Sequence, residues 1–320
     1  SLLAFVFINV FFYRIQEHGT DKSAQILIFI LFIELVSLKN LKLVIDETFS
    51  KIMIILSLII SFKSFYILYS IFLIPVGIYL LNNKKINIQN YLFKNFFVYF
   101  FVLTIFLVSI ISLLNSGCLV YPISLTCFDS LSWSIPISEV NHMNNWYEQW
   151  SKAGAGPNFR VENPEIYIQK FNWLNHWLEY YFFNKVSDFL FGIIFLMLII
   201  FISIFYKKNT KKIEVNRDFK SILLILFLLF IEWFYNHPAL RYGGYSVIAL
   251  SFFIPFSFIL SKFKNIKNFN NKVYFVICLA VIIFTGRNID RIGNEHEFYK
   301  YQALKNPYHR VYKKRFFRKI

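Results

Sequence analysis

The sequence predicts an all-α membrane protein, a polytopic helix bundle with one long loop outside the membrane. Hydrophobic residues make up 57% of the 320 positions and the mean hydropathy is +0.51, which is too apolar for a soluble domain of this size. The apolar residues are gathered in runs. Most of the loops between these runs are short and rich in lysine, whereas one loop is long and holds five of the six tryptophans.

About nine apolar runs are candidates for membrane segments. A spanning helix needs ~20 residues, and flanking residues extend the shorter runs toward that length. The first run is about half that long and the chain opens on Ser1, so we expect an N-terminal truncation. The third and fourth runs can be read as two short helices or as one long helix. The runs are residues 2–12, 24–38, 52–62, 65–81, 96–114, 189–206, 222–234, 245–260 and 273–284.

The charges of the loops predict the orientation of the helices. Residues 207–220 hold six basic and two acidic residues, and residues 262–272 hold four lysines and no acidic residue. Basic loops stay on the cytoplasmic side, so both loops are expected inside. Residues 115–188 hold four basic and seven acidic residues and are expected outside. By parity the tail, residues 285–320, is also outside, although ten of its residues are basic.

These features predict one membrane domain over residues 1–320, with an extracytoplasmic insert at 115–188 and a basic C-terminal tail at 285–320. The net charge of +16 does not indicate nucleic-acid binding, because the basic residues stand in small clusters at the ends of apolar runs. In such positions they contact lipid headgroups. Membrane lipids are therefore expected partners, and nucleic acid is not.

Two cysteines of the outer insert predict a disulfide. Cys118 and Cys127 are nine positions apart in a compartment that permits oxidation. Two buried free thiols are the alternative. Metal binding is disfavoured because no histidine lies close to either cysteine, and no metal-ligand cluster is evident, so any cofactor is unknown. Cys278 lies within an apolar run and is expected to pack there.

The tryptophans of the insert form two pairs at helical spacing. Trp146 and Trp150, like Trp173 and Trp177, are four residues apart, so each pair is expected on one face of a short helix. Rings placed in this way can lie at the membrane interface. They can also stack on a sugar or on a polyprenyl chain. Residues 153–157 predict a turn between the two helices.

Polar residues gather at the outer ends of the predicted segments in four stretches: residues 14–22, Lys63, residues 232–244 and residues 287–291. Charged groups at membrane depth are costly, so a cluster at one surface indicates a functional site. Basic side chains can hold a lipid phosphate, and a carboxylate can accept the proton of an attacking hydroxyl. The candidate bases are Asp21 and Glu17. The candidate phosphate- or substrate-binding residues are Arg241, His237, Lys63, His18 and Glu232.

A purely structural role stays open for several of these residues. Lys63 and the arginines of 287–291 can extend to headgroups, and Glu17 and Asp21 can cap a helix. Arg241 is the strongest single candidate. It is one of nine arginines against 25 lysines, and it lies in a loop punctuated by proline and glycine.

These stretches resemble a known family. The alternating helices, the long aromatic outer loop, the lysine at the turn Ser61-Phe62-Lys63-Ser64 and the His-Pro-x-x-Arg-Tyr-Gly loop at 237–243 are similar to bacterial membrane proteins related to the GT-C glycosyltransferases. Residues 13–25 and 116–122 also resemble members of that group. The resemblance covers most of the chain, and its motifs are short.

The resemblance implies a helical domain of the bacterial inner membrane that transfers a sugar from a polyprenyl-phosphate donor to an acceptor on the outer face, in cell-envelope polysaccharide synthesis. It also implies that an acidic residue of the first outer loop acts as the base, here Asp21 or Glu17. Arg241, His237 and Lys63 would hold the departing lipid phosphate.

Two other functions are considered. An O-antigen-polymerase-like enzyme would share the large outer loop and would join whole repeat units. A transporter or flippase of lipid-linked glycans should show charged residues in mid-helix, broken helices at the midplane and paired repeats. The sequence shows almost none of these features.

Overall fold

The computed structural model describes residues 1–13, 20–37, 45–84, 93–154, 161, 163–204, 217–261 and 269–299. In these residues the regular elements are helices, and no strand is present. The all-α prediction is therefore confirmed.

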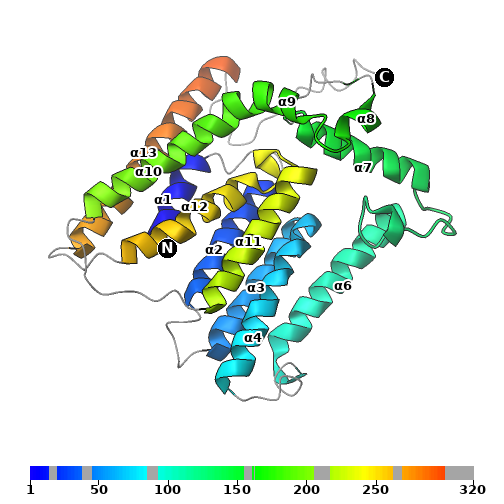
Figure 1. Cartoon of the computed structure of the whole chain (residues 1–320), viewed down its shortest axis with the longest axis horizontal. Helices are drawn as coiled ribbons and strands as arrows, with labels where there is room; N and C mark the ends of the chain where they lie inside the picture. Colours follow the sequence, from blue (N-terminus) through cyan, green and yellow to red (C-terminus); the bar gives the residue numbers. More distant parts are fainter. Residues whose placement is uncertain are drawn as a thin grey trace. The chain divides into compact units, whose positions relative to one another are not determined.

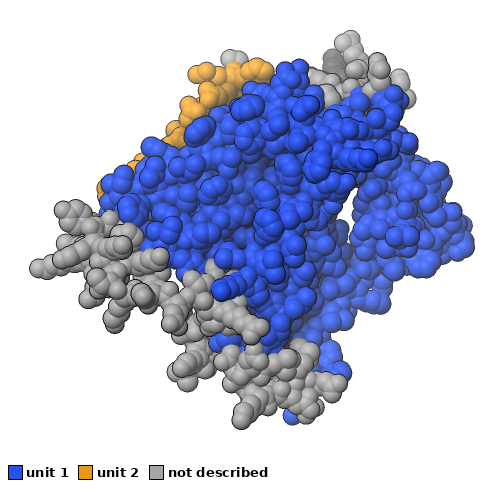
Figure 2. Space-filling view, in the orientation of Figure 1, with its two compact units in different colours: residues 1, 18–267 blue, residues 2–17, 268–320 orange. Residues whose placement is uncertain are grey.

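The contacts between residues divide the chain into two compact units, which Figure 2 colours separately. The large unit comprises Ser1 and His18–Lys267, and the small unit comprises Leu2–Glu17 and Asn268–Ile320. In the small unit α1 (Leu2–Phe11) packs against the long helix α13 (Phe269–Tyr299).

The small unit contains an arginine that joins its two chain segments. The Arg287 Nη1 donates a hydrogen bond of 2.6 Å to the carbonyl oxygen of Val10. Its guanidinium carbon also lies 3.8 Å from the centroid of the Tyr13 ring. Arg287 thus has a structural role that connects α13 to the end of α1.

The first half of the large unit consists of helices packed on α3 (Figure 1). The helices α2 (Asp21–Ser37), η1 (Ser64–Phe72) and α6 (Phe96–Ser116) all contact α3 (Ile45–Phe62). The chain breaks at Lys63, whose backbone is extended, before η1 continues into α4 (Leu73–Lys84). Residues 52–81 therefore form separate helices on either side of Lys63, and not one long helix.

The second half of the large unit contacts the first half through two helices and a short 3₁₀ turn. The helix α11 (Arg217–Asn236) contacts η1, α4 and α12 (Gly244–Ser261), and α12 contacts α2. The short 3₁₀ turn η4 (Leu240–Tyr242) lies between α11 and α12 and contacts α2 as well. The helix α10 (Ser187–Ile204) packs on α12.

The predicted outer insert folds into short helices, and a disulfide joins two cysteines near its start. The helices are η2 (Ser124–Thr126), α7 (Ile137–Lys152), α8 (Pro164–Ile168), α9 (Leu174–Trp177) and the π-helical segment η3 (Leu178–Val186). Cys118 and Cys127 are joined, which confirms the predicted disulfide. Cys278 is a free cysteine with an exposed side chain, so it does not pack in a core as expected.

The two tryptophan pairs have different surroundings. Trp146 and Trp150 stack at 5.3 Å on α7, and Trp146 is exposed. Trp173 and Trp177 are buried, and both contact the ring of Phe234 on α11. The second pair therefore builds the core between the insert and α11, whereas the first pair presents a ring to the surroundings.

Three helices in the described residues are long and apolar enough to cross a membrane: Phe96–Ser116, Leu174–Ser203 and Asn270–Phe298. Shorter apolar helices cover Leu2–Phe11, Ser64–Tyr79 and Gly244–Leu260. Length and composition thus place the chain among membrane proteins. The nine predicted runs coincide largely with helices. In the described residues, fewer than nine of these helices are both long enough and apolar enough to cross a membrane. The helix α3, for example, is 18 residues long and carries Asp46, Glu47 and Lys51 near its start.

Candidate functional site

The fold brings together three charged residues that are far apart in the sequence. Asp21 lies in the first turn of α2, Lys63 stands at the break after α3, and Arg241 lies in η4. One carboxylate oxygen of Asp21 pairs with the Lys63 ammonium. The other accepts a hydrogen bond of 2.8 Å from the Arg241 Nε. We call these three residues the charge cluster.

The charge cluster is buried at its acidic centre and open at its basic edge. The Asp21 side chain is 8% exposed, whereas the side chains of Lys63 and Arg241 are 30% and 55% exposed. Two cations paired with one carboxylate leave a net positive charge. An anion that approaches from outside therefore meets the cations first.

Neighbouring residues of α2 hold the charge cluster in place. The fully buried Gln25 donates a hydrogen bond of 2.9 Å to the carbonyl oxygen of Arg241 and accepts one of 3.1 Å from the Ser246 amide. Thr20 donates a hydrogen bond of 2.6 Å to the carbonyl oxygen of Phe62, next to Lys63. The start of α2 thus binds the end of α3 on one side and η4 on the other.

The loop that carries Arg241 is fixed by side chains from the insert. The Trp177 indole donates to the carbonyl oxygen of Pro238 at 3.0 Å, and the Tyr181 hydroxyl accepts from the Leu240 amide at 2.9 Å. The Ser151 hydroxyl accepts from the Ala239 amide at 3.3 Å. These backbone groups are buried, so such bonds avoid the cost of unsatisfied polar atoms. The insert therefore positions the loop directly.

The backbone conformation explains why the His-Pro-x-x-Arg-Tyr-Gly loop ends in a glycine. Gly243 has φ +102°, a left-handed conformation that other residues rarely adopt. A Cβ atom there would also lie 3.2 Å from the Tyr66 ring. The glycine allows η4 to turn sharply into α12 beside η1.

His237 lies beside the charge cluster in a neutral form. Its ring centroid is 5.4 Å from that of Phe65 and 6.1 Å from that of Tyr242. Burial, followed by the positive charges of Lys152 and Lys63, lowers the pKa of His237 to about 4. At neutral pH it can offer a hydrogen bond to a phosphate, but it adds no positive charge.

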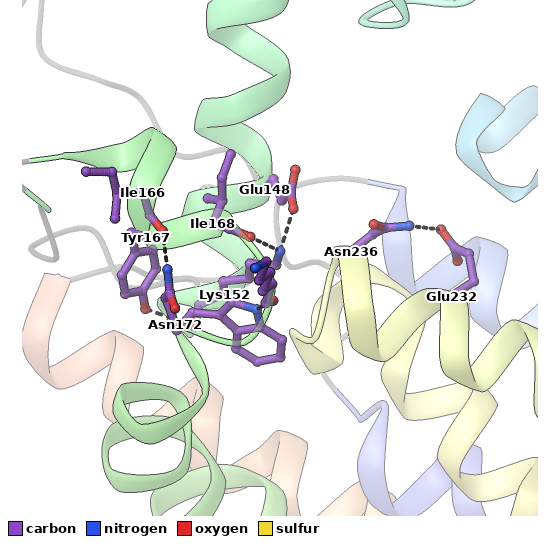
Figure 3. A network of polar contacts seen from close by, with 10 residues as sticks. Glu148, Lys152, Ile166, Tyr167, Ile168, Asn172, Glu232 and Asn236 are labelled. Atoms are coloured by element: carbon purple, nitrogen blue, oxygen red, sulfur yellow. Dashed lines mark hydrogen bonds and ion pairs between the residues drawn. The ribbon is translucent and has the colours of Figure 1, made fainter.

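Glu232 lines a small pocket next to the charge cluster. It accepts a hydrogen bond of 3.3 Å from the Asn236 side chain, as drawn in Figure 3. The pocket lies between η1, α11 and the start of α12, and Tyr66, Tyr69 and Tyr242 also line it. The hydroxyls of Tyr66 and Tyr69 are buried and have no hydrogen-bond partner among the described residues.

Two predicted site residues, Glu17 and His18, lie outside the described residues. In the part of the chain that is described, no group of three or more His, Cys, Asp or Glu side chains is arranged to hold a metal ion. Among the predicted site residues, the ion pairs bring Asp21, Lys63 and Arg241 into direct contact.

Comparison with known proteins supplies a family. Residues 1–248 match the family described as a domain of unknown function, DUF8201. The chain belongs to this family. No curated protein and no solved structure matches it. The matched DUF8201 region contains all three residues of the charge cluster and ends within α12, so the candidate site lies inside the family domain.

The DUF8201 region also contains a buried lysine that organises the insert (Figure 3). Lys152, at the end of α7, has a side chain with no exposed area. Its ammonium donates to the Glu148 carboxylate at 2.5 Å and to the carbonyl oxygen of Ile168 at 2.7 Å. It also lies 5.4 Å and 5.2 Å from the ring centroids of Trp173 and Tyr235. This cage joins α7 to the segment after α8 and to α11.

Sequence reasoning missed several residues that shape the site. Gln25 had a visible signal, because it is a polar residue one helical turn after Asp21, near the start of a largely apolar run. Ser151 and Tyr181 had none, because their partners belong to a distant segment. Their roles follow from tertiary packing alone. Lys152 has the i,i+4 partner Glu148, but its burial and its contacts with Ile168 and Tyr235 depend on other segments.

Proposed function

We propose that this DUF8201 protein is a membrane glycosyltransferase that moves a sugar from a polyprenyl-phosphate donor to an acceptor outside the membrane. The supporting observation is the charge cluster, a buried carboxylate beneath two partly exposed cations. Cations beside apolar helices suit a lipid phosphate, whose head is anionic and whose tail is apolar. The sequence resemblance to the GT-C group points to the same donor.

The cluster supplies the two chemical functions that such a transfer needs. Arg241 and Lys63 hold the phosphate, and Arg241 can form two parallel hydrogen bonds with it. Once the phosphate pairs with these cations, the Asp21 carboxylate is released to accept a proton from the acceptor hydroxyl. The acceptor oxygen bonds to the anomeric carbon while the bond to the phosphate oxygen breaks. The phosphate leaves as the anion, which the two cations stabilise.

The proposal also includes the position in the membrane. The nine apolar segments cross or enter the bacterial inner membrane, and the charge cluster lies at its outer surface under the insert. Lipid-linked donors diffuse laterally in this layer, and the side of the cluster with the partly exposed Lys63 and Arg241 receives them. The product belongs to the cell envelope.

The first test is Arg241→Lys, which keeps the charge and removes the planar fork of donors. Transfer activity should fall about tenfold or more, which corresponds to roughly 1.4 kcal/mol or more of lost transition-state stabilisation. Glycan synthesis is measured in a deletion strain complemented with the variant at equal membrane expression. The matched control is Arg287→Lys, in the small unit, where activity should stay near that of the wild type.

A binding measurement separates the phosphate role from other defects. Polyprenyl monophosphate is titrated against the purified protein in nanodiscs, and Arg241→Lys should bind it more weakly than the wild type and Arg287→Lys do. Unchanged binding together with wild-type glycan levels would show that Arg241 only anchors the loop, and the proposal would fail.

A further inference from the structure

The disulfide-closed hairpin after α6 has an unusual surface. Residues 117–128 contain no charged residue, and the first charge after α6 is Asp129. Four apolar side chains of the hairpin are exposed, among them Leu125 at 95%. The others are Leu119, Ile123 and Phe128. An exposed cluster of this kind with no charge usually marks a contact surface.

The backbone of the hairpin is closed by a covalent bond and by hydrogen bonds. The Cys118–Cys127 disulfide closes it, and the Leu119 amide donates to the carbonyl oxygen of Thr126 at 3.0 Å. At its base the Phe128 amide donates to the carbonyl oxygen of Gly117 at 2.9 Å. Gly117 has φ +77° and ends α6 in the left-handed conformation that turns the chain back.

The hairpin folds back onto the last turn of α6 at Tyr121, and Trp133 of the following segment contacts the same turn. The Tyr121 amide donates to the Ser112 hydroxyl at 3.3 Å, and the Trp133 indole donates to the carbonyl oxygen of Leu113 at 3.2 Å. Ser112 lies one helical turn before the end of α6 at Ser116, which is about 6 Å along the axis. The segment between α6 and α7 can be followed in Figure 1.

The properties of the adjacent helix α6 indicate what covers the apolar surface of the hairpin. Among the candidate spanning helices of the described residues α6 has the highest hydropathy, and only 6% of its most apolar stretch is buried in the protein. Most of its apolar side chains are therefore exposed, as expected for a helix that faces lipid. The hairpin follows directly on this helix. Trp133, which is half exposed and bonds to Leu113, stands at the level of its last turn, where tryptophan favours the membrane interface.

We propose that the hairpin of residues 117–128 is a lipid-inserted anchor in the leaflet where α6 ends. Its apolar side chains enter the boundary between headgroups and acyl chains, and the disulfide keeps them extended toward the lipid. The anchor fixes the insert at the membrane surface independently of any chemistry at the charge cluster. The occupant is bilayer lipid.

The test places a spin label at Leu125→Cys in a Cys278→Ser background that keeps the native disulfide. The protein is reconstituted in liposomes, and collision rates with oxygen and with a water-soluble nickel chelate are compared. Oxygen concentrates in lipid and the chelate in water, so the ratio of oxygen to nickel collisions should be severalfold higher at position 125 than at Glu139→Cys, an exposed position on α7.

Two results would overturn the proposal. A ratio at position 125 equal to that at position 139 would place the hairpin in water. Spin–spin broadening at position 125 that disappears on dilution with unlabelled protein would show that a second copy of the chain, and not lipid, covers the hairpin. Both labelled sites are exposed, so neither label requires the core to rearrange.

Discussion

Burial decides what the ionisable side chains of this protein can do. Asp21 is buried and remains paired with two cations, and Lys152 is buried and remains surrounded by a carboxylate, a carbonyl and two rings. Unpaired charges in such places would cost several kcal/mol. His237 is partly buried beside the charges of Lys152 and Lys63, so it stays neutral at pH 7.

At the residue scale we therefore expect a pH dependence from His237. Its pKa is about 4 in the folded protein and about 6.5 when unfolded, so between these values the unfolded chain binds more protons. This contribution to stability is complete above pH 6.5 and is lost as the pH falls toward 4. The slope is at most about 1.4 kcal/mol per pH unit.

Thermal unfolding in detergent at pH 7 and pH 5 measures this effect. His237→Asn should lose less stability between the two pH values than the wild type does. His142→Asn, an exposed substitution on α7, should behave as the wild type. If both variants keep the full dependence, other groups are responsible for it.

At the element scale the hairpin after α6 depends on its disulfide. The two cysteines crosslink positions nine apart in the sequence, and the loss of such a crosslink costs about 2–3 kcal/mol in the chain-entropy description. Cys118 is buried beside Ser116, so the end of α6 should loosen as well. A double Cys118→Ser, Cys127→Ser variant should therefore unfold at a lower temperature than the wild type.

The melting temperature is compared without reductant, with Cys278→Ser as the control. The control should match the wild type because Cys278 is a free, exposed cysteine. An unchanged melting temperature in the double variant would mean that the hydrogen bonds of the hairpin hold it closed without the disulfide.

At the scale of the whole molecule the orientation of the helices is the main expectation that follows from charge. The insert should face outside and the loop before α13 should face the cytoplasm. In a Cys278→Ser background, a cysteine at Glu139 should react with a membrane-impermeant maleimide in spheroplasts, whereas one at Asn270 should react only after the membrane is permeabilised. Both positions are exposed in the structure. Equal labelling before permeabilisation would contradict the orientation.

The sequence by itself predicted the helical class, the approximate positions of the apolar helices and the disulfide. Runs of apolar residues and the spacing of two cysteines are local signals, and helices satisfy their backbone groups within each segment. It also selected Asp21, Lys63 and Arg241 as candidates, because each lies at the predicted outer end of an apolar run, and each can be recognised there singly.

Only the tertiary structure decided which of these residues meet. Lys63 lies 42 positions from Asp21, and Arg241 lies 220 positions from it, so their contact depends on how α2, α3 and η4 pack. The same packing buried Trp173 in the core and left Trp146 exposed, although both belong to pairs with the same spacing. It also gave Gln25 and Ser151 their backbone partners. Such contacts join segments far apart in the chain, and no local pattern of residues encodes them.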